Sequence, residues 1–274
     1  MEDVTEPAEP AAGGAARLFA VMRALALHQH SASRVKDVAQ AVGLTQATTH
    51  RLLQSLVKEG MVEQDTRSKR YRLSIEFFAL AAQAGNLSGL RQLCRPVLLR
   101  LGARLNDAIF LLVRSGFDAV CLDRNEGPYA IRTFTGGIGG RVPLGVGQAA
   151  TAILAFLPDE EREAVLQFNL PRLREYGLLD EVSLRSEIEQ VRACGYASRR
   201  AGLLDGMAGV AVPILDREGR AVAALGVGTL IERLSPERLP IVVDLMQRET
   251  AEVGRQINPF DPALWNPAAE LTQR

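Results

Sequence analysis

The stretch that decides the fold is Val35-Lys-Asp-Val-Ala-Gln-Ala-Val-Gly-Leu-Thr-Gln-Ala-Thr-Thr-His-Arg-Leu-Leu-Gln-Ser-Leu-Val-Lys-Glu-Gly60. Its apolar residues recur at helical spacing in two runs, which are separated by Gly43 and its neighbour. The spacing predicts a helix from Val35, a tight turn at Gly43, and a second helix that Thr45 caps and Gly60 ends. Two short helices around a glycine turn are typical of a helix-turn-helix.

The flanking residues extend this motif to a winged helix-turn-helix over residues 15–73. Upstream, an apolar stripe over residues 18–25 predicts an additional helix, and Ser33 is suited to cap the helix that follows. Downstream, the strand-like runs 61–64 and 70–73 enclose a polar turn, which predicts a hairpin, or wing.

The charges are segregated in the same region. The 274-residue chain has 32 basic and 32 acidic residues, yet residues 17–73 carry ten Lys and Arg against four Asp and Glu. All three lysines and all three histidines lie before residue 71. A basic module on a neutral body is the pattern expected when one domain binds a polyanion.

The outward face of the second helix of the motif carries short or hydrogen-bonding side chains and one long cation. Such side chains can reach base edges in the major groove, while cations on a wing can hold phosphates. We therefore predict that the chain binds double-stranded DNA through helix residues Thr45, Gln46, Ala47, Thr48, His50, Arg51 and Gln54, and wing residues Arg67, Lys69 and Arg70.

The rest of the chain predicts an α+β domain over residues 89–257, in which helices flank an antiparallel sheet. A linker at 74–88, helical over 75–84, leads into it, and the tails 1–14 and 258–274 are predicted to be disordered or loose. Strands are expected at 109–113, 119–122, 131–134, 207–215 and 221–229, and helices from Leu90 and Pro158 and at 147–157, 183–194 and 236–257.

Catalytic and metal chemistry finds little support in this body. Residues 74–274 contain no histidine, the commonest general base and metal ligand, and no GxSxG elbow. Cys94, Cys121 and Cys194 are scattered without a CxxC, which indicates a reducing cytoplasm. No apolar run is long enough to cross a bilayer. We predict a cytoplasmic protein that is no enzyme and uses no metal or cofactor.

One glycine-rich segment, Gly145-Val-Gly-Gln-Ala-Ala150, is superficially like a dinucleotide-binding turn. It lacks the acidic residue that such a turn requires about 20 positions on. A glycine-flanked turn that opens a helix also offers free backbone N–H groups to an anion or a carbonyl. We therefore predict a ligand contact here.

With these segments in place, the chain resembles the IclR family of bacterial transcription regulators. The likeness spans roughly residues 15–256 and rests on the order of several blocks. They are Arg17-Leu-Phe-Ala-Val-Met-Arg-Ala-Leu25, the 35–60 stretch, Gly139-Gly-Arg-Val-Pro-Leu144, Val191-Arg-Ala-Cys-Gly-Tyr-Ala197 and Val210-Ala-Val-Pro-Ile-Leu-Asp-Arg-Glu-Gly219. His50 stands where the family often has Tyr, which puts the operator preference in doubt.

The resemblance implies a GAF-like effector-binding domain and self-association into dimers or tetramers. It places the effector contacts at Gln148, Ala149, Arg199, Met207, Gly209, Gly226 and Gly228. Where the family commonly has acids, this chain has arginines at 199 and 200, which favours an anionic effector, such as a carboxylate. The three glycines are expected to leave room for a bulky ligand, such as an aromatic acid.

The function expected from this resemblance is a transcription regulator, a repressor or a dual regulator, gated by a small metabolite. A dimer would place its recognition helices on a pseudo-palindromic operator. Two alternatives stay open at this point: an enzyme with a winged-helix appendage, and a winged helix that binds a protein. Turnover of a bound ligand would favour the first, and failure to shift DNA in a gel would favour the second.

Overall fold

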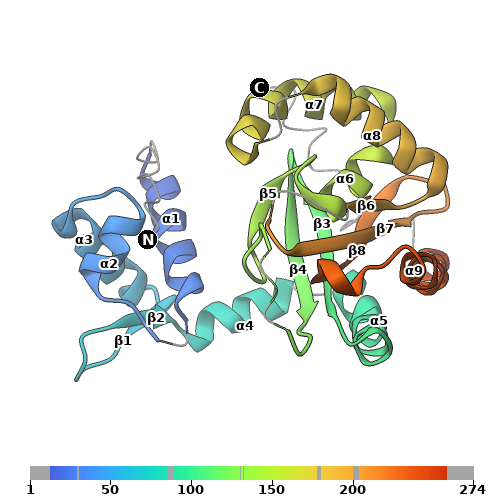
Figure 1. The fold of residues 1–274 in the computed structure, drawn as a ribbon. Helices are drawn as coiled ribbons and strands as arrows, with labels where there is room; N and C mark the ends of the chain where they lie inside the picture. Colours follow the sequence, from blue (N-terminus) through green and yellow to red (C-terminus); the bar gives the residue numbers. More distant parts are fainter. Residues whose placement is uncertain are drawn as a thin grey trace. The chain divides into compact units, whose positions relative to one another are not determined.

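The chain divides into two compact units, Met1–Asn86 and Leu87–Arg274 (Figure 1). The computed structural model describes residues 13–257 apart from 30, 85–88, 130, 132, 178–179 and 200–203, and the side chains of 81–84 are also left out. The tail predicted at 258–274 lies outside the described residues. So does the one at 1–14, apart from Gly13 and Gly14, of which Gly14 begins the first helix.

The first unit is a winged helix-turn-helix, as the sequence predicts. Thr45 caps the third helix, because its Oγ1 accepts the backbone N–H of Thr48 at 3.2 Å. Gly43 and Gly60 have φ of 65° and 73°, which suits glycine at both turns. In chain order the elements are α1 (Gly14–Leu27), α2 (Val35–Ala41), α3 (Gln46–Lys58), β1 (Val62–Gln64), β2 (Tyr71–Leu73) and α4 (Ile75–Ala84).

The cap of α2 differs from the prediction. Arg34, not Ser33, is the N-cap residue, and its backbone N–H donates to Asp37 Oδ2 at 3.2 Å. Ser33 is buried in an isolated bridge to the wing, where it exchanges backbone hydrogen bonds of 2.9 and 2.8 Å with Tyr71. Tertiary pairing with the wing therefore outweighs the local capping preference of serine.

A single apolar core joins α1, α2 and α3 to the hairpin. Val21, Leu25, Leu53 and Tyr71 are each at most 1% exposed. Because α3 turns Leu53 and Thr49 toward this core, its opposite face remains in solvent. The packing thus determines which face of α3 is available to DNA.

The second unit is built on a six-stranded antiparallel sheet of order β5-β4-β3-β8-β7-β6. Its strands are β3 (Ala108–Ser115), β4 (Asp118–Asn125), β5 (Arg141–Pro143), β6 (Ala197–Arg199), β7 (Met207–Leu215) and β8 (Ala221–Leu230). Its helices are α5 (Gly89–Leu105), α6 (Gly147–Ala155), α7 (Asp159–Leu173), α8 (Glu181–Cys194) and α9 (Arg238–Gln256), with short 3-10 turns η2 (Arg174–Tyr176) and η3 (Ile231–Arg233).

Helices cover both faces of this sheet (Figure 1). Since side chains alternate along a strand, one face packs on α6, α7 and α8 and the other on α5 and α9. Phe110 and Ala211 belong to the first core, which we call the inner face, and Ile109 and Val212 belong to the second. The α+β class with an antiparallel sheet flanked by helices is confirmed.

One strand prediction was wrong, and two short strands were not predicted. The described residues of the predicted strand 131–134 form loop and turn, and the strand that pairs with β4 is β5, at Arg141–Pro143. The short strand β6, after the Gly195 turn, was not predicted. Three-residue strands carry too few alternations to be read from a sequence. The helices and the long strands β7 and β8 lie close to their predicted positions.

A buried carboxylate ties the end of the sheet to α9. Asp107 accepts hydrogen bonds from Thr229 Oγ1 at 2.7 Å, Arg233 Nε at 2.9 Å and Arg238 Nη2 at 2.7 Å. Its side chain is 1% exposed, while the two arginine side chains keep 26% and 25% of their surface in solvent.

Within the described part of the chain, no helix is long and apolar enough to span a membrane.

Candidate functional sites

The predicted base-reading residues share one surface of α3. Gln46, Ala47, His50 and Arg51 are exposed, as are Thr45 at the cap and Gln54, whereas Thr48 is half-buried. Arg51 makes no side-chain hydrogen bond or ion pair with the described residues. Its guanidinium is therefore available to a base edge or a phosphate.

Gln54 differs from its neighbours on this surface. Its Nε2 donates to the hydroxyl of Tyr71 at 3.1 Å, so the side chain lies against the wing. Because Tyr71 is buried, this bond links the recognition helix to the hairpin. A role for Gln54 in reading a base remains a prediction, and it requires the side chain to leave Tyr71.

The wing turn is organised by Asp65. The carboxylate accepts the backbone N–H groups of Ser68 and Arg67, and chiefly the bond from Ser68 lowers the pKa of Asp65 below its ordinary value. Arg67 and Lys69 project from this turn into solvent without a side-chain partner among the described residues. Both fit the predicted phosphate contacts.

Arg70 is held by the protein itself. Its Nη1 donates to the carbonyl oxygens of Ala32 at 2.9 Å and Ser31 at 3.4 Å, and the residue is half-buried. This arginine therefore fastens the wing to the segment before α2. The predicted DNA contact at Arg70 is untested, and the geometry offers fewer free N–H groups there than at Arg67.

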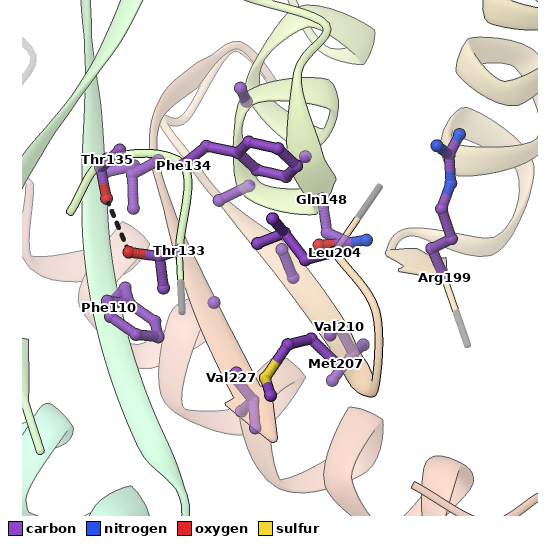
Figure 2. Close-up of a pocket in the computed structure, with 18 of the residues that line it drawn as sticks. Phe110, Thr133, Phe134, Thr135, Gln148, Arg199, Leu204, Met207, Val210 and Val227 are labelled. Atoms are coloured by element: carbon purple, nitrogen blue, oxygen red, sulfur yellow. Dashed lines mark hydrogen bonds between the residues drawn. The ribbon is translucent and has the colours of Figure 1, made fainter. Parts of the chain in front are cut away.

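The second unit contains a cavity of about 110 Å³ between the inner face of the sheet and the N-terminus of α6 (Figure 2). All seven residues that the resemblance indicated line it, although they come from four separate segments. They are Gln148, Ala149, Arg199, Met207, Gly209, Gly226 and Gly228. The structure thus brings the predicted effector residues together around one space.

The hollow exists because the inner face of β7 and β8 lacks large side chains. Gly209 pairs with Gly228 across the strands, and Ala211 pairs with Gly226. Above them, α6 begins at Gly147, whose φ of 75° favours glycine and turns the chain into the helix. The first turn of α6 brings its backbone N–H groups to the cavity, as the sequence predicts for a helix N-terminus.

The expectation that the glycines leave room for a bulky ligand was wrong in part. A Cβ at Gly228 would stand 2.9 Å from Phe110 and 3.0 Å from Ile131, and one at Gly209 would stand 2.8 Å from Gln148 Oε1. The protein's own side chains therefore occupy most of the space that the glycines open. What remains is small, since an engineered cavity of about 150 Å³ holds benzene.

Arg199 does not point into the cavity. Figure 2 shows its guanidinium directed away from the other lining residues, and Nη2 donates to Glu187 Oε2 at 2.6 Å. The two side chains are 29% and 23% exposed, so the pair is partly shielded from water. The predicted role of Arg199 as a carboxylate clamp is untested, and this pairing does not favour it.

Several lining residues were missed. Phe110 forms a wall from β3, where strand alternation places it on the inner face, a signal that could have identified it. Thr133 and Thr135 also line the cavity, with their hydroxyl oxygens 3.5 Å apart. These threonines lie in a loop, which has no periodic signal.

No His, Cys, Asp or Glu cluster suited to a metal occurs among the described residues.

Comparison with known proteins identifies the family of both units. The chain matches the IclR helix-turn-helix domain over residues 14–66 and the bacterial transcriptional regulator IclR C-terminal domain over residues 83–255. It is 27% identical over 234 residues to the Bacillus subtilis HTH-type transcriptional regulator KipR, with 85% of this chain and 92% of KipR covered. It is also 27% identical over 249 residues to the Klebsiella pneumoniae repressor AllR, with 89% and 90% covered.

Among solved structures, the fold is similar to an IclR homologue from Microbacterium hydrocarbonoxydans in complex with 4-hydroxybenzoate. The TM-score is 0.71 at 22% identity, and the match covers 87% of this chain and 98% of that one. The relatives named here are transcription regulators, which argues against the reading as an enzyme with a DNA-binding appendage. The chain belongs to the IclR family of bacterial transcription regulators, and it is a DNA-binding regulator of the IclR type.

Proposed function

We propose that this regulator is a repressor that releases its operator when a small acid fills the cavity above β7 and β8. The observation that carries the proposal is the convergence of seven residues, indicated by the family resemblance, on one cavity in the unit that lacks the winged helix-turn-helix. Occupancy can alter DNA binding only if the effector binds the DNA-competent and incompetent states with different affinity.

The size and lining of the cavity support a compact ligand. At about 110 Å³ the cavity is well below the volume of a drug-sized site, and because it is partly open to the surface, a small ring could enter it without being fully enclosed. Phe110, Met207 and Leu204 offer apolar surface, while Thr133, Gln148 and the first turn of α6 offer hydrogen bonds. The structural relative solved with 4-hydroxybenzoate makes single-ring carboxylates the first compounds to test.

A dimer is the form of the protein that we propose binds DNA. The first unit exposes an unusual number of large apolar side chains on α1 and α4: Phe19, Leu27, Ile75, Phe78 and Leu80 are between 47% and 76% exposed. A second copy of the chain would cover them and present two recognition helices to half-sites about 34 Å apart, or a multiple of that distance. Pairing of dimers into tetramers remains a prediction from the family.

The decisive experiment measures DNA affinity with and without ligand. Fluorescence anisotropy on the intergenic DNA upstream of the gene should show tight binding that benzoate, 4-hydroxybenzoate or a related small acid weakens by about tenfold or more. Gly226→Val adds a side chain to the cavity floor, where the new Cβ alone would stand 3.6 Å from Ala149 Cβ. It should keep DNA binding and lose the response.

Two results would overturn the proposal. One is a wild-type protein that shifts no DNA at low salt, which would favour the alternative of a protein-binding winged helix. The other is a Gly226→Val protein that still responds to the acid as wild type does, which would place the effector elsewhere. A bound acid that is consumed during the assay would instead revive the enzyme alternative.

A further inference from the structure

The cavity has one polar end, and a cation lies behind it. Thr133 and Thr135 lie next to Phe110 on one side of the cavity, far from Arg199 (Figure 2). Arg124 on β4 is the register partner of Phe110 on β3, so both side chains project from the same face of the sheet. The guanidinium carbon of Arg124 stands 5.2 Å from the centroid of the Phe110 ring. The ring thus separates this cation from the cavity.

Arg124 holds the loop that forms this polar end. Its Nη1 donates to the carbonyl oxygen of Gly136 at 2.6 Å, directly after Thr135. Its Nη2 donates to Glu126 Oε2 at 2.6 Å. The Glu126 side chain is 65% exposed, so water screens this pair and the positive charge is only weakly compensated.

One donor of Arg124 has no acceptor among the residues that the structure describes. The Arg124 side chain is only 16% exposed. Its Nε atom is buried and lacks a hydrogen-bond partner among the described residues. A buried N–H on a charged group is seldom left without an acceptor, because desolvating it is unfavourable. The Phe110 ring that this guanidinium lies over also lines the cavity, so a ligand oxygen in the cavity would come within reach of the guanidinium if the ring moved.

Among the described residues, two cations near the cavity therefore differ. Arg199 is paired with a half-buried carboxylate and directed outward, whereas Arg124 faces the cavity wall with one unsatisfied donor. On this basis we propose that the carboxylate of the effector lies at the Thr133–Thr135 end, with Arg124 as its counter-ion. A shift of the Phe110 ring gives the carboxylate access to the guanidinium. The inference rests on the proposed function, since it names the group that selects an acid.

Paired ligands test the charge directly. Benzoate and 4-hydroxybenzoate, with the uncharged benzamide and 4-hydroxybenzamide, are titrated by calorimetry into the full-length wild type, Arg124→Met and Arg199→Met. Arg124→Met should weaken binding of the acids by at least about tenfold and that of the amides by less than about twofold. Arg199→Met removes the other described arginine at the cavity, and it should weaken binding of the acids far less than Arg124→Met does, because its guanidinium is paired with Glu187.

Each other result has a definite meaning. Three results would overturn the role of Arg124. Wild type and Arg124→Met could bind the acids equally well, or Arg124→Met could lose the acids and the amides to the same extent. The third is a loss of acid binding in Arg199→Met and not in Arg124→Met. A wild type that binds none of the four compounds would overturn the effector class of the proposed function as well. If Arg124→Met does not fold, Arg124→Gln and Phe110→Ala replace it. Phe110→Ala uncovers the guanidinium and should raise the preference for acid over amide, and an unchanged preference would refute the inference.

Discussion

The two units of this regulator treat their positive charges in opposite ways. On the winged helix-turn-helix, Arg51, Arg67 and Lys69 extend into solvent without a partner among the described residues. In the effector unit, most of the described arginines are matched with carboxylates: Arg185, for example, lies 2.7 Å from Glu163 and 2.8 Å from Glu181, and it lowers the pKa of Glu163. An unpaired positive charge attracts phosphates at long range, whereas a charge paired with a carboxylate attracts them much less and instead links segments of the domain.

This difference explains how one neutral chain can bind DNA and also select a small acid. If the effector unit carried a surplus of free arginines, it would compete with the winged helix for the nucleic acid. Because most of its described arginines are paired with carboxylates, an anion meets an unpaired guanidinium at few places in the described part of this unit. The cavity wall at Phe110, with Arg124 behind it, is the place that the geometry favours.

The largest effect that we expect is a decrease in the free energy of unfolding when a buried carboxylate is removed from its paired arginines. Asp107→Ala removes the carboxylate that three donors share, and it leaves Arg233 and Arg238 without compensation. Breaking a fully buried ion pair costs about 3–5 kcal/mol, and since both arginines are about a quarter exposed we expect roughly 2–4 kcal/mol. Calorimetric or denaturant unfolding of the full chain measures the change in the free energy of unfolding.

An exposed pair supplies the control for Asp107. Asp244 and Arg248 lie one helical turn apart on α9, with side chains 56% and 75% exposed. Asp244→Ala should change the free energy of unfolding by under about 0.5 kcal/mol, as isolated surface pairs do. An equal decrease in the free energy of unfolding for both variants would show that burial does not strengthen the Asp107 network. Paired charge in the effector unit would then contribute no more to stability than an exposed surface pair.

A smaller effect is expected where a free cation reads DNA. Arg51→Ala should weaken binding to the operator by about 1–3 kcal/mol, or roughly 5- to 150-fold, and leave weak binding to unrelated DNA almost unchanged. Arg67→Ala should weaken both equally and lower the slope of log affinity against log salt by about one. Anisotropy titrations at several salt concentrations separate the two patterns. Identical patterns for both variants would refute the division between a reading helix and an anchoring wing.

Regular periodicity explains why the first unit could be predicted so fully from the sequence. Leu53 and Leu56 recur at helical spacing, Gly43 and Gly60 mark the turns, and Thr45 is a local cap, so each choice depends on neighbours in the chain. The one error, at Ser33, came from a bridge to Tyr71, a residue 38 positions away. Contacts between distant residues are what a local pattern cannot show.

The cavity could be predicted in its position but not in its contents. The resemblance identified the seven lining residues, and the alternation of small residues on β7 and β8 explains the hollow. The partner of Arg199, the filling of the glycine space by Phe110 and the unsatisfied donor of Arg124 depend on where side chains from four segments meet. None of these has a signature within a single stretch of sequence, so specificity was harder to predict than fold.

Arg70 offers the finest test of the contrast, because it belongs to the DNA-binding unit but its guanidinium is held by the protein, through carbonyl oxygens and not through a carboxylate. Its bonds to the carbonyl oxygens of Ser31 and Ala32 fasten the wing. Arg70→Ala should therefore lower the free energy of unfolding by about 1 kcal/mol, since the bonds are charge-assisted but partly exposed. It should reduce the salt slope of DNA binding by less than the unit expected for Arg67→Ala. The opposite result, full stability with a slope lower by one, would show that Arg70 leaves the carbonyls for a phosphate when DNA is bound.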